Sequence, residues 1–200
     1  MGQHTTATVL VVDDEPAITD LYATWLDDHH DVRTADGGKA ALAAVDETVD
    51  VLLLDRRMPD LTGDEVLARI RDWGLDCRVV MVTAVHPDFD IVEMAFDDYV
   101  TKPVDRTALL ESVEAVTVRD TYDEKLREYF ALASKKAALE VEKTPSELRS
   151  SDRYRSLNRS VRTLEAEAES LLSGFEDNFE TLFRDFPGGS EDRNGPGTFE

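Results

Sequence analysis

Cysteine is almost absent from this 200-residue chain, in which Cys77 is the only one. A single cysteine forms no internal disulfide and supplies no cysteine-rich metal site, which argues against a disulfide-stapled secreted domain. Long apolar runs are also missing, since none approaches the ~20 residues that span a bilayer. No basic-then-apolar signal opens the chain. We therefore expect a soluble cytoplasmic protein that makes no use of a membrane.

Basic residues are scarce, with 22 Lys and Arg against 43 Asp and Glu, for a net charge of −21. Indiscriminate DNA binding depends on basic side chains that neutralise phosphates, so this balance disfavours it. A strongly acidic surface is typical of proteins adapted to high salt, where screening weakens self-repulsion. Residues 1–119 hold 25 of the acids and 10 of the bases, whereas residues 120–200 hold 18 and 12. This asymmetry suggests two domains.

The periodicity of apolar residues predicts alternating strands and helices in the first part of the chain. Short apolar runs predict strands, and three stretches between them have helical spacing. The predicted strands are 8–12, 31–35, 50–54, 77–83 and 98–101, and the predicted helices are 17–26, 37–47 and 63–73. Such alternation favours an α/β fold, in which helices cover both faces of a parallel sheet.

Polar residues follow four of these strands at the point where each strand ends. Asp13 and Asp14 follow the first strand, Asp55 the third, Thr83 the fourth and Lys102 the fifth. Ligands bind at the carboxyl ends of parallel strands, so these side chains should converge. A carboxylate cluster is costly without a cation, and all-oxygen ligation suits Mg²⁺. An ammonium and a hydroxyl beside it would complete a site for a phosphoryl group.

The segments "VVDDEP", "LLLDRRMPDLTGDEV", "VVMVTA" and "DDYVTKP" resemble, in this order and spacing, the receiver domains of two-component response regulators. The resemblance covers residues 7–118 and implies a five-stranded, doubly wound parallel sheet of the flavodoxin type. It implies that Asp55 accepts a phosphoryl group from a sensor histidine kinase, and that Mg²⁺ is the cofactor. By the same resemblance Asp14 and Asp55 ligate the metal, Asp13 helps to hold it, and the backbone carbonyl of Arg57 is a further ligand.

The resemblance also assigns roles around the acceptor. Lys102 would pair with the phosphoryl oxygens, Thr83 would swing to bond them, and Tyr99 matches the switching aromatic of the family. The Lys102–Pro103 bond is expected to be cis. The chain would then be a phosphoacceptor capable of self-dephosphorylation and not an enzyme acting on other substrates.

Two arginines directly follow the acceptor and leave alternatives open. Arg56 and Arg57 would contact the phosphoryl group or an acidic kinase surface, or would offset acidic neighbours as exposed charges. In the family, the residues at the positions of Arg57 and Val85 tune the lifetime of the phosphate. Neither is a water-positioning group, which favours slow self-hydrolysis.

The sequence predicts a helical hairpin in the C-terminal part of the chain. Residues 105–142 contain no Gly or Pro and predict one continuous helix, and Thr144, Pro145 and Glu147 are placed to start a second helix, over about 146–185. Its apolar positions follow a heptad spacing typical of a coiled coil: Tyr154, Leu157, Val161, Leu164, Ala168, Leu171, Phe175 and Leu182, with a polar Asn178. The facing residues on the first helix are expected to be Leu126, Phe130, Ala133, Ala137 and Val141.

By position, length and helical character, residues 119–186 resemble the HalX domain of halophilic archaea, and residues 187–200 form a tail rich in Gly, Pro and acid that we expect to be disordered. The aromatic residues of 175–186 are expected to press against the receiver or a second molecule.

Three function classes follow. The first is a phosphorylation-controlled switch that acts through protein–protein contacts of the C-terminal helices, including a homodimer through the last receiver helix and these helices. The second is a transcription regulator whose hairpin tip contacts DNA, because residues 135–162 hold eight bases against four acids. These bases are Lys135, Lys136, Lys143, Arg149, Arg153, Arg155, Arg159 and Arg162. Their interleaving with acids favours a salt-bridged helix face instead. The third, a phosphatase using Asp55, lacks the second Asp that haloacid-type enzymes need, because Arg57 stands there.

Overall fold

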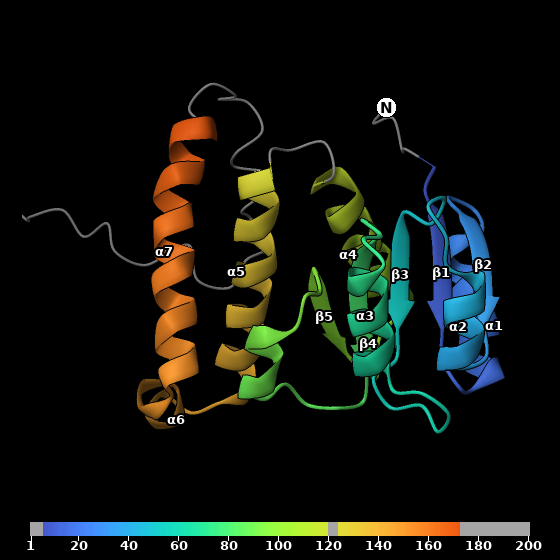
Figure 1. The fold of residues 1–200 in the computed structure, drawn as a ribbon, viewed down its shortest axis with the longest axis horizontal. Helices are drawn as coiled ribbons and strands as arrows, with labels where there is room; N and C mark the ends of the chain where they lie inside the picture. Colours follow the sequence, from blue (N-terminus) through green and yellow to red (C-terminus); the bar gives the residue numbers. More distant parts are fainter. Residues whose placement is uncertain (1–5, 120–123, 173–200) are drawn as a thin grey trace, which may run out of the picture.

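The computed structural model describes residues 6–119 and 124–172. Within them, five parallel strands form one sheet with the order β2-β1-β3-β4-β5 (Figure 1). The strands are β1 (Thr8–Val12), β2 (Asp31–Ala35), β3 (Val51–Leu54), β4 (Arg78–Thr83) and β5 (Asp98–Thr101). The predicted fold class is confirmed.

Helices cover both faces of the sheet because its central strands are apolar on both sides. Alternate residues of β1 point to opposite faces, so that Val9 and Val11 join one core and Leu10 and Val12 the other. The first core is closed by α1 (Pro16–Leu26) and α4 (Arg106–Arg119). The second core is closed by α2 (Gly38–Ala44), α3 (Gly63–Asp72) and the short 3₁₀ helix η1 (Phe89–Glu93).

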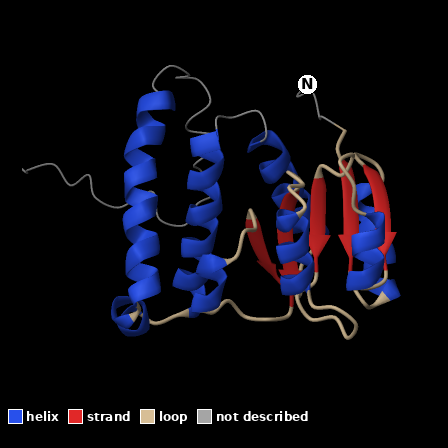
Figure 2. Cartoon of the chain, in the orientation of Figure 1, coloured by secondary structure: helices blue, strands red, loops and turns tan. Residues whose placement is uncertain are grey.

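The C-terminal helices are α5 (Glu124–Glu142), α6 (Pro145–Ser150) and α7 (Asp152–Leu172). The predicted start after Thr144 is confirmed, because the Thr144 and Glu147 side chains form a reciprocal capping box. The second helix is not continuous, however, since Ser151 has an extended ψ of 121° and separates α6 from α7. Helices α5 and α7 lie side by side as an antiparallel pair joined at α6 (Figure 2).

The predicted apolar contact positions between α5 and α7, called here the seam, are right in part. Leu157 and Val161 are buried, and Tyr154 and Leu164 pack against the same core. Val141 is 81% exposed, and Leu139, two residues earlier, is buried in its place. The predictions for Phe175, Asn178, Leu182 and the tail concern positions outside the described residues.

The predicted continuity of the last receiver helix with the hairpin is wrong. Asp98 at the start of β5 accepts a hydrogen bond from Ser112 of α4 at 2.6 Å and one from Ser134 of α5 at 2.5 Å. A straight helix would separate these two serines by ~33 Å, at 1.5 Å for each residue. The chain therefore reverses between α4 and α5, and α5 returns along β5 and η1.

This reversal gives the hairpin and the receiver a common core. One cluster contains Ile91, Phe96 and Tyr99 of the receiver together with Phe130, Leu139 and Leu157 of the hairpin, among other residues. Burying each such side chain stabilises the structure by roughly 1.5–3 kcal/mol. The hairpin is therefore packed onto the β5 edge of the receiver.

Candidate functional site

Three of the predicted site residues meet at the carboxyl ends of the strands. Asp13 after β1 is 2% exposed and Asp55 after β3 is 6% exposed. The Nζ atom of Lys102, after β5, donates to Asp13 Oδ2 at 2.5 Å and to Asp55 Oδ1 at 2.9 Å. Two buried carboxylates thus share one ammonium group, and the set keeps one negative charge.

The ammonium is strongly held in this arrangement. Burial alone would lower the pKa of Lys102, but its hydrogen bonds to Asp13 and Asp55 outweigh burial, and the pKa is raised above its ordinary value. Lys102 therefore stays charged at neutral pH and can face a newly arrived anion.

Backbone contacts fix the Asp55 carboxylate. The Asp55 N–H donates to the Val12 carbonyl at 2.9 Å, and the Arg57 N–H donates to Asp55 Oδ2 at 2.6 Å. Gly63 closes the following loop, with its N–H donating to the Arg56 carbonyl at 2.9 Å. A Cβ atom on Gly63 would lie 2.2 Å from the Asp55 carbonyl oxygen, so no other residue fits without moving the loop.

Thr83 and Tyr99 are linked through one residue between them. The Val85 N–H donates to Thr83 Oγ1 at 3.3 Å, and the Tyr99 hydroxyl donates to the Val85 carbonyl at 2.6 Å. Burial raises the pKa of Tyr99, so its hydroxyl keeps its proton. The Lys102–Pro103 bond is cis, as expected.

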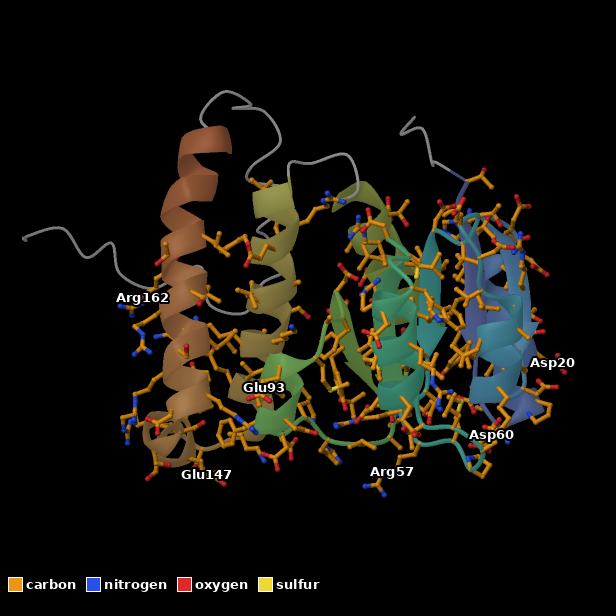
Figure 3. The ribbon with its side chains drawn as sticks, in the orientation of Figure 1. Asp20, Arg57, Asp60, Glu93, Glu147 and Arg162 are labelled. Carbon is orange, nitrogen blue, oxygen red and sulfur yellow. The ribbon has the colours of Figure 1, made fainter. Side chains whose placement is uncertain are left out.

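The structure separates the two arginines that follow the acceptor. Arg56 is nearly buried and forms a two-pronged contact with Asp64, at 2.9 Å from Nε and 3.0 Å from Nη2, and it also donates to Asp90 of η1. It therefore offsets acidic neighbours. The Arg57 side chain is exposed and points away from the protein (Figure 3). The partnership of Arg56 with Asp90 spans 34 residues, and no sequence signal marked it.

The carboxylates suit a hard cation by donor type and charge. Asp13 and Asp55 are buried at one point with a residual negative charge, and the exposed Asp14 follows directly. Oxygen donors of this kind fit Mg²⁺. In the residues that the structure describes, no group of three or more His, Cys, Asp or Glu is arranged to hold a metal. Asp14 would have to join the two buried carboxylates for a complete ligand set.

The basic residues of the hairpin mostly have local partners. Lys136 pairs with Glu140, Lys143 with Asp88, Arg153 with Glu93 and Arg155 with Asp152. Lys135 is buried and donates to the Met94 carbonyl at 2.5 Å. Five of the eight bases are thus engaged within the molecule, which favours the salt-bridged reading over a DNA-contacting tip. Among the described helices, none is long and apolar enough to cross a membrane.

A model of the response regulator receiver domain matches residues 9–114. The chain belongs to the response regulator receiver family. A model of the HalX domain matches residues 118–183, so the receiver is followed by a HalX domain.

Three relatives show how far this similarity extends. A Haloferax volcanii protein named "Putative transcriptional regulator" is 48% identical over 177 residues, which are 88% of this chain and 30% of that protein. The regulatory protein PhoP of Bacillus subtilis is 37% identical over 116 residues, which are 56% of this chain and 48% of PhoP. The chain therefore spans less than half the length of these two relatives. The response regulator TrrA of Thermotoga maritima, solved in complex with Mg²⁺ and BeF, is 33% identical with a TM-score of 0.50, covering 56% of this chain and 99% of TrrA.

The match to a halophile protein over most of the chain agrees with the acidic composition. The matches to PhoP and TrrA cover little more than the receiver part, and the receiver is therefore the part of the chain shared with bacterial response regulators.

Proposed function

We propose that Asp55 is the phosphoacceptor of this response regulator and that a sensor histidine kinase is its donor. The observation that carries the proposal is the Lys102 ammonium placed between Asp55 and Asp13 at the rim of the packed sheet. A carboxylate fixed on a rigid strand end, with a cation beside it, has what an in-line phosphoryl transfer requires.

The proposed step is a displacement at phosphorus. An Asp55 carboxylate oxygen forms the new P–O bond while the bond from phosphorus to the donor histidine nitrogen breaks and its electron pair returns to the imidazole. The Arg57 N–H keeps the other oxygen, Oδ2, in place. Lys102 then exchanges its contact with Asp55 Oδ1 for the phosphoryl oxygens, where negative charge accumulates. The Thr83 hydroxyl donates to a phosphoryl oxygen.

Mg²⁺ is the cofactor of this proposal, and it supplies additional positive charge to the phosphoryl oxygens. Asp13, Asp14 and Asp55 would hold it through carboxylate oxygens, with the Arg57 backbone carbonyl as a further ligand. Support comes from the residual negative charge of the Asp13–Lys102–Asp55 set and from the oxygen-only donors around it.

In this proposal the C-terminal helices carry the output of the response regulator. Loading of Asp55 changes their contacts, either with the receiver or with a second copy of the chain, through Thr83 and Tyr99. The chain then acts in the cytoplasm as a phosphoacceptor with slow self-dephosphorylation and has no other substrate. The domain limits of the proposal are 7–118 for the receiver and 119–186 for the HalX part.

Acetyl phosphate labelling with Mg²⁺ tests the acceptor. Intact mass and peptide mapping should place one labile phosphoryl group on Asp55, and Asp55→Asn should abolish it. The matched control is Asp20→Asn, which removes an equal charge from the exposed side of α1 and should label normally. Wild-type labelling of Asp55→Asn would overturn the assignment.

A metal titration tests the Mg²⁺ ligands separately. Asp14→Asn should weaken Mg²⁺ binding by at least tenfold, because it removes a charged ligand, whereas Asp20→Asn should not. Equal affinities in the two variants would remove Asp14 from the metal site.

A further inference from the structure

One segment of the chain touches both the acceptor site and the hairpin. It comprises residues 84–94, from the end of β4 to the residue that follows η1, and is called here the β4–η1 segment. On the site side, Val85 holds the Thr83 hydroxyl through its N–H and the Tyr99 hydroxyl through its carbonyl. A movement of Thr83 therefore acts first on Val85.

The site reaches the same segment by a second route. Arg56, the residue directly after Asp55, joins Asp64 of α3 to Asp90 of η1. The Arg56 side chain is nearly buried, whereas the Asp90 carboxylate is about half exposed, so solvent partly screens this contact. Two residues of the acceptor region, Thr83 and Arg56, thus form hydrogen bonds with the β4–η1 segment.

The turn of the hairpin, residues 142–153, contacts the other side of this segment and is called here the elbow. Glu142 lies 3.1 Å from His86, Lys143 lies 3.1 Å from Asp88, and Arg153 lies 2.9 Å from Glu93. Lys143 also stands over the Phe89 ring at 5.6 Å. The elbow and the carboxyl ends of the strands lie at the same end of the molecule, and Glu93 lies beside the elbow (Figures 1 and 3).

The β4–η1 segment can transmit a displacement of Thr83 to the elbow. It contains no glycine and one proline, Pro87, so few backbone angles can absorb a movement locally. Val85, which holds Thr83, is directly followed by His86, which holds Glu142. When the Thr83 hydroxyl turns to a phosphoryl oxygen, the Val85 N–H loses its acceptor. This N–H is part-buried, and leaving it without a partner costs free energy unless the segment shifts.

We propose that the elbow of the HalX hairpin is a clamp on the β4–η1 segment and that loading of Asp55 releases it. This inference rests on the proposed function, because it takes Asp55 as the loaded residue. The clamp holds the unloaded arrangement through two partly exposed ion pairs, Lys143–Asp88 and Arg153–Glu93, and the hydrogen bond between His86 and Glu142. Loading therefore shifts the population towards a hairpin with a free elbow. Because coupling between two sites is reciprocal, weakening the clamp must also make the site easier to load.

The expected size of the effect follows from the contacts. These three partly exposed contacts together support a coupling of about three- to tenfold. The test uses the full chain with Mg²⁺ and beryllofluoride as the probe. The clamp variant is the triple substitution Glu142→Gln, Lys143→Gln and Arg153→Gln.

The matched control is Glu128→Gln, Arg149→Gln and Arg159→Gln. It makes the same net change of charge on the same part of the chain, at exposed positions for which the described structure shows no contact with the β4–η1 segment.

Hydrogen exchange is measured across residues 84–94 and 139–153 of the wild type, with and without beryllofluoride. The beryllofluoride concentration that half-saturates Asp55 is then measured for the wild type and for each triple variant. The proposal expects several-fold faster exchange in both segments of the loaded wild type. It also expects half-saturation of the clamp variant at an approximately three- to tenfold lower probe concentration, with the control unchanged.

Unchanged or slower exchange in a demonstrably loaded wild type overturns the clamp, and so does equal half-saturation of the two triple variants. Both results leave the acceptor assignment intact. A wild type that neither labels with acetyl phosphate nor binds the probe overturns the proposed function itself, so the two failures are distinguishable.

Discussion

Lys135 offers the sharpest test of how the hairpin packs on the receiver. It lies on α5, is 5% exposed, donates to the Met94 carbonyl and stands 5.0 Å over the Phe96 ring. Burial lowers the pKa of Lys135 to about 8, although nearby Asp97 acts to raise it. The charged form is therefore disfavoured by the site that contains it.

The sign and size of the pH dependence follow. The folded chain releases the Lys135 proton near pH 8, whereas the unfolded chain keeps it up to about pH 10.4. Between these values the unfolded state binds more protons, so this residue makes the free energy of unfolding rise with pH. The gain from pH 7 to pH 9.5 is about 2 kcal/mol for this one group.

The assay compares the wild type with Lys135→Met in urea at pH 7 and pH 9.5. Methionine fills a similar volume without the charge, so its stability lacks this contribution. We expect the wild type to gain about 2 kcal/mol relative to Lys135→Met over this range. Lys136→Met, at the adjacent and more exposed lysine, should show no such gain. A constant difference between wild type and Lys135→Met would refute the buried position of the ammonium, and with it the docking of α5 on η1.

Other substitutions test the remaining contacts. Asp98→Ala should lower the free energy of unfolding by about 2–4 kcal/mol in a urea titration, because it leaves two buried serine hydroxyls without an acceptor. Gly63→Ala should reduce acetyl phosphate labelling at Asp55 severalfold, since its Cβ would collide with the Asp55 carbonyl. Leu164→Asp should separate α7 from α5 and cost about 2–4 kcal/mol, whereas Thr163→Asp on the exposed side should be nearly neutral. Retained stability in Leu164→Asp would contradict the seam.

The sheet and the convergence of three site residues could be predicted because their signals are local. An apolar run such as Val51–Leu54 marks a strand by itself, and a carboxylate at its end is visible without any partner. Parallel pairing then places the ends of all strands at one edge. The meeting of Asp13, Asp55 and Lys102 needed no knowledge of contacts between distant residues.

The path of the C-terminal half could not be predicted in the same way. Helical propensity is continuous from residue 105 to 142, and neither Gly nor Pro marks an end. The contacts that hold α5 against the sheet include the shared apolar core and the Asp98 carboxylate, which accepts from Ser112 and from Ser134. These contacts join Asp98 to residues 14 and 36 positions away, and helical propensity contains no information about them. The same holds for Arg56, whose partner Asp90 lies on a different element.

The reversal changes what the HalX domain can do. A helix continuous with the receiver would carry a signal outward along its axis, but a hairpin packed on η1 and β5 responds through the strength of that packing. An all-apolar seam would hold the hairpin firmly in one place. This contact instead includes a lysine whose burial is costly, two partly exposed ion pairs and an exposed hydrogen bond between His86 and Glu142. In the clamp that we propose, polar contacts of this kind would leave the held and released arrangements within a few kcal/mol of each other, which is the range in which one phosphoryl group can shift the balance.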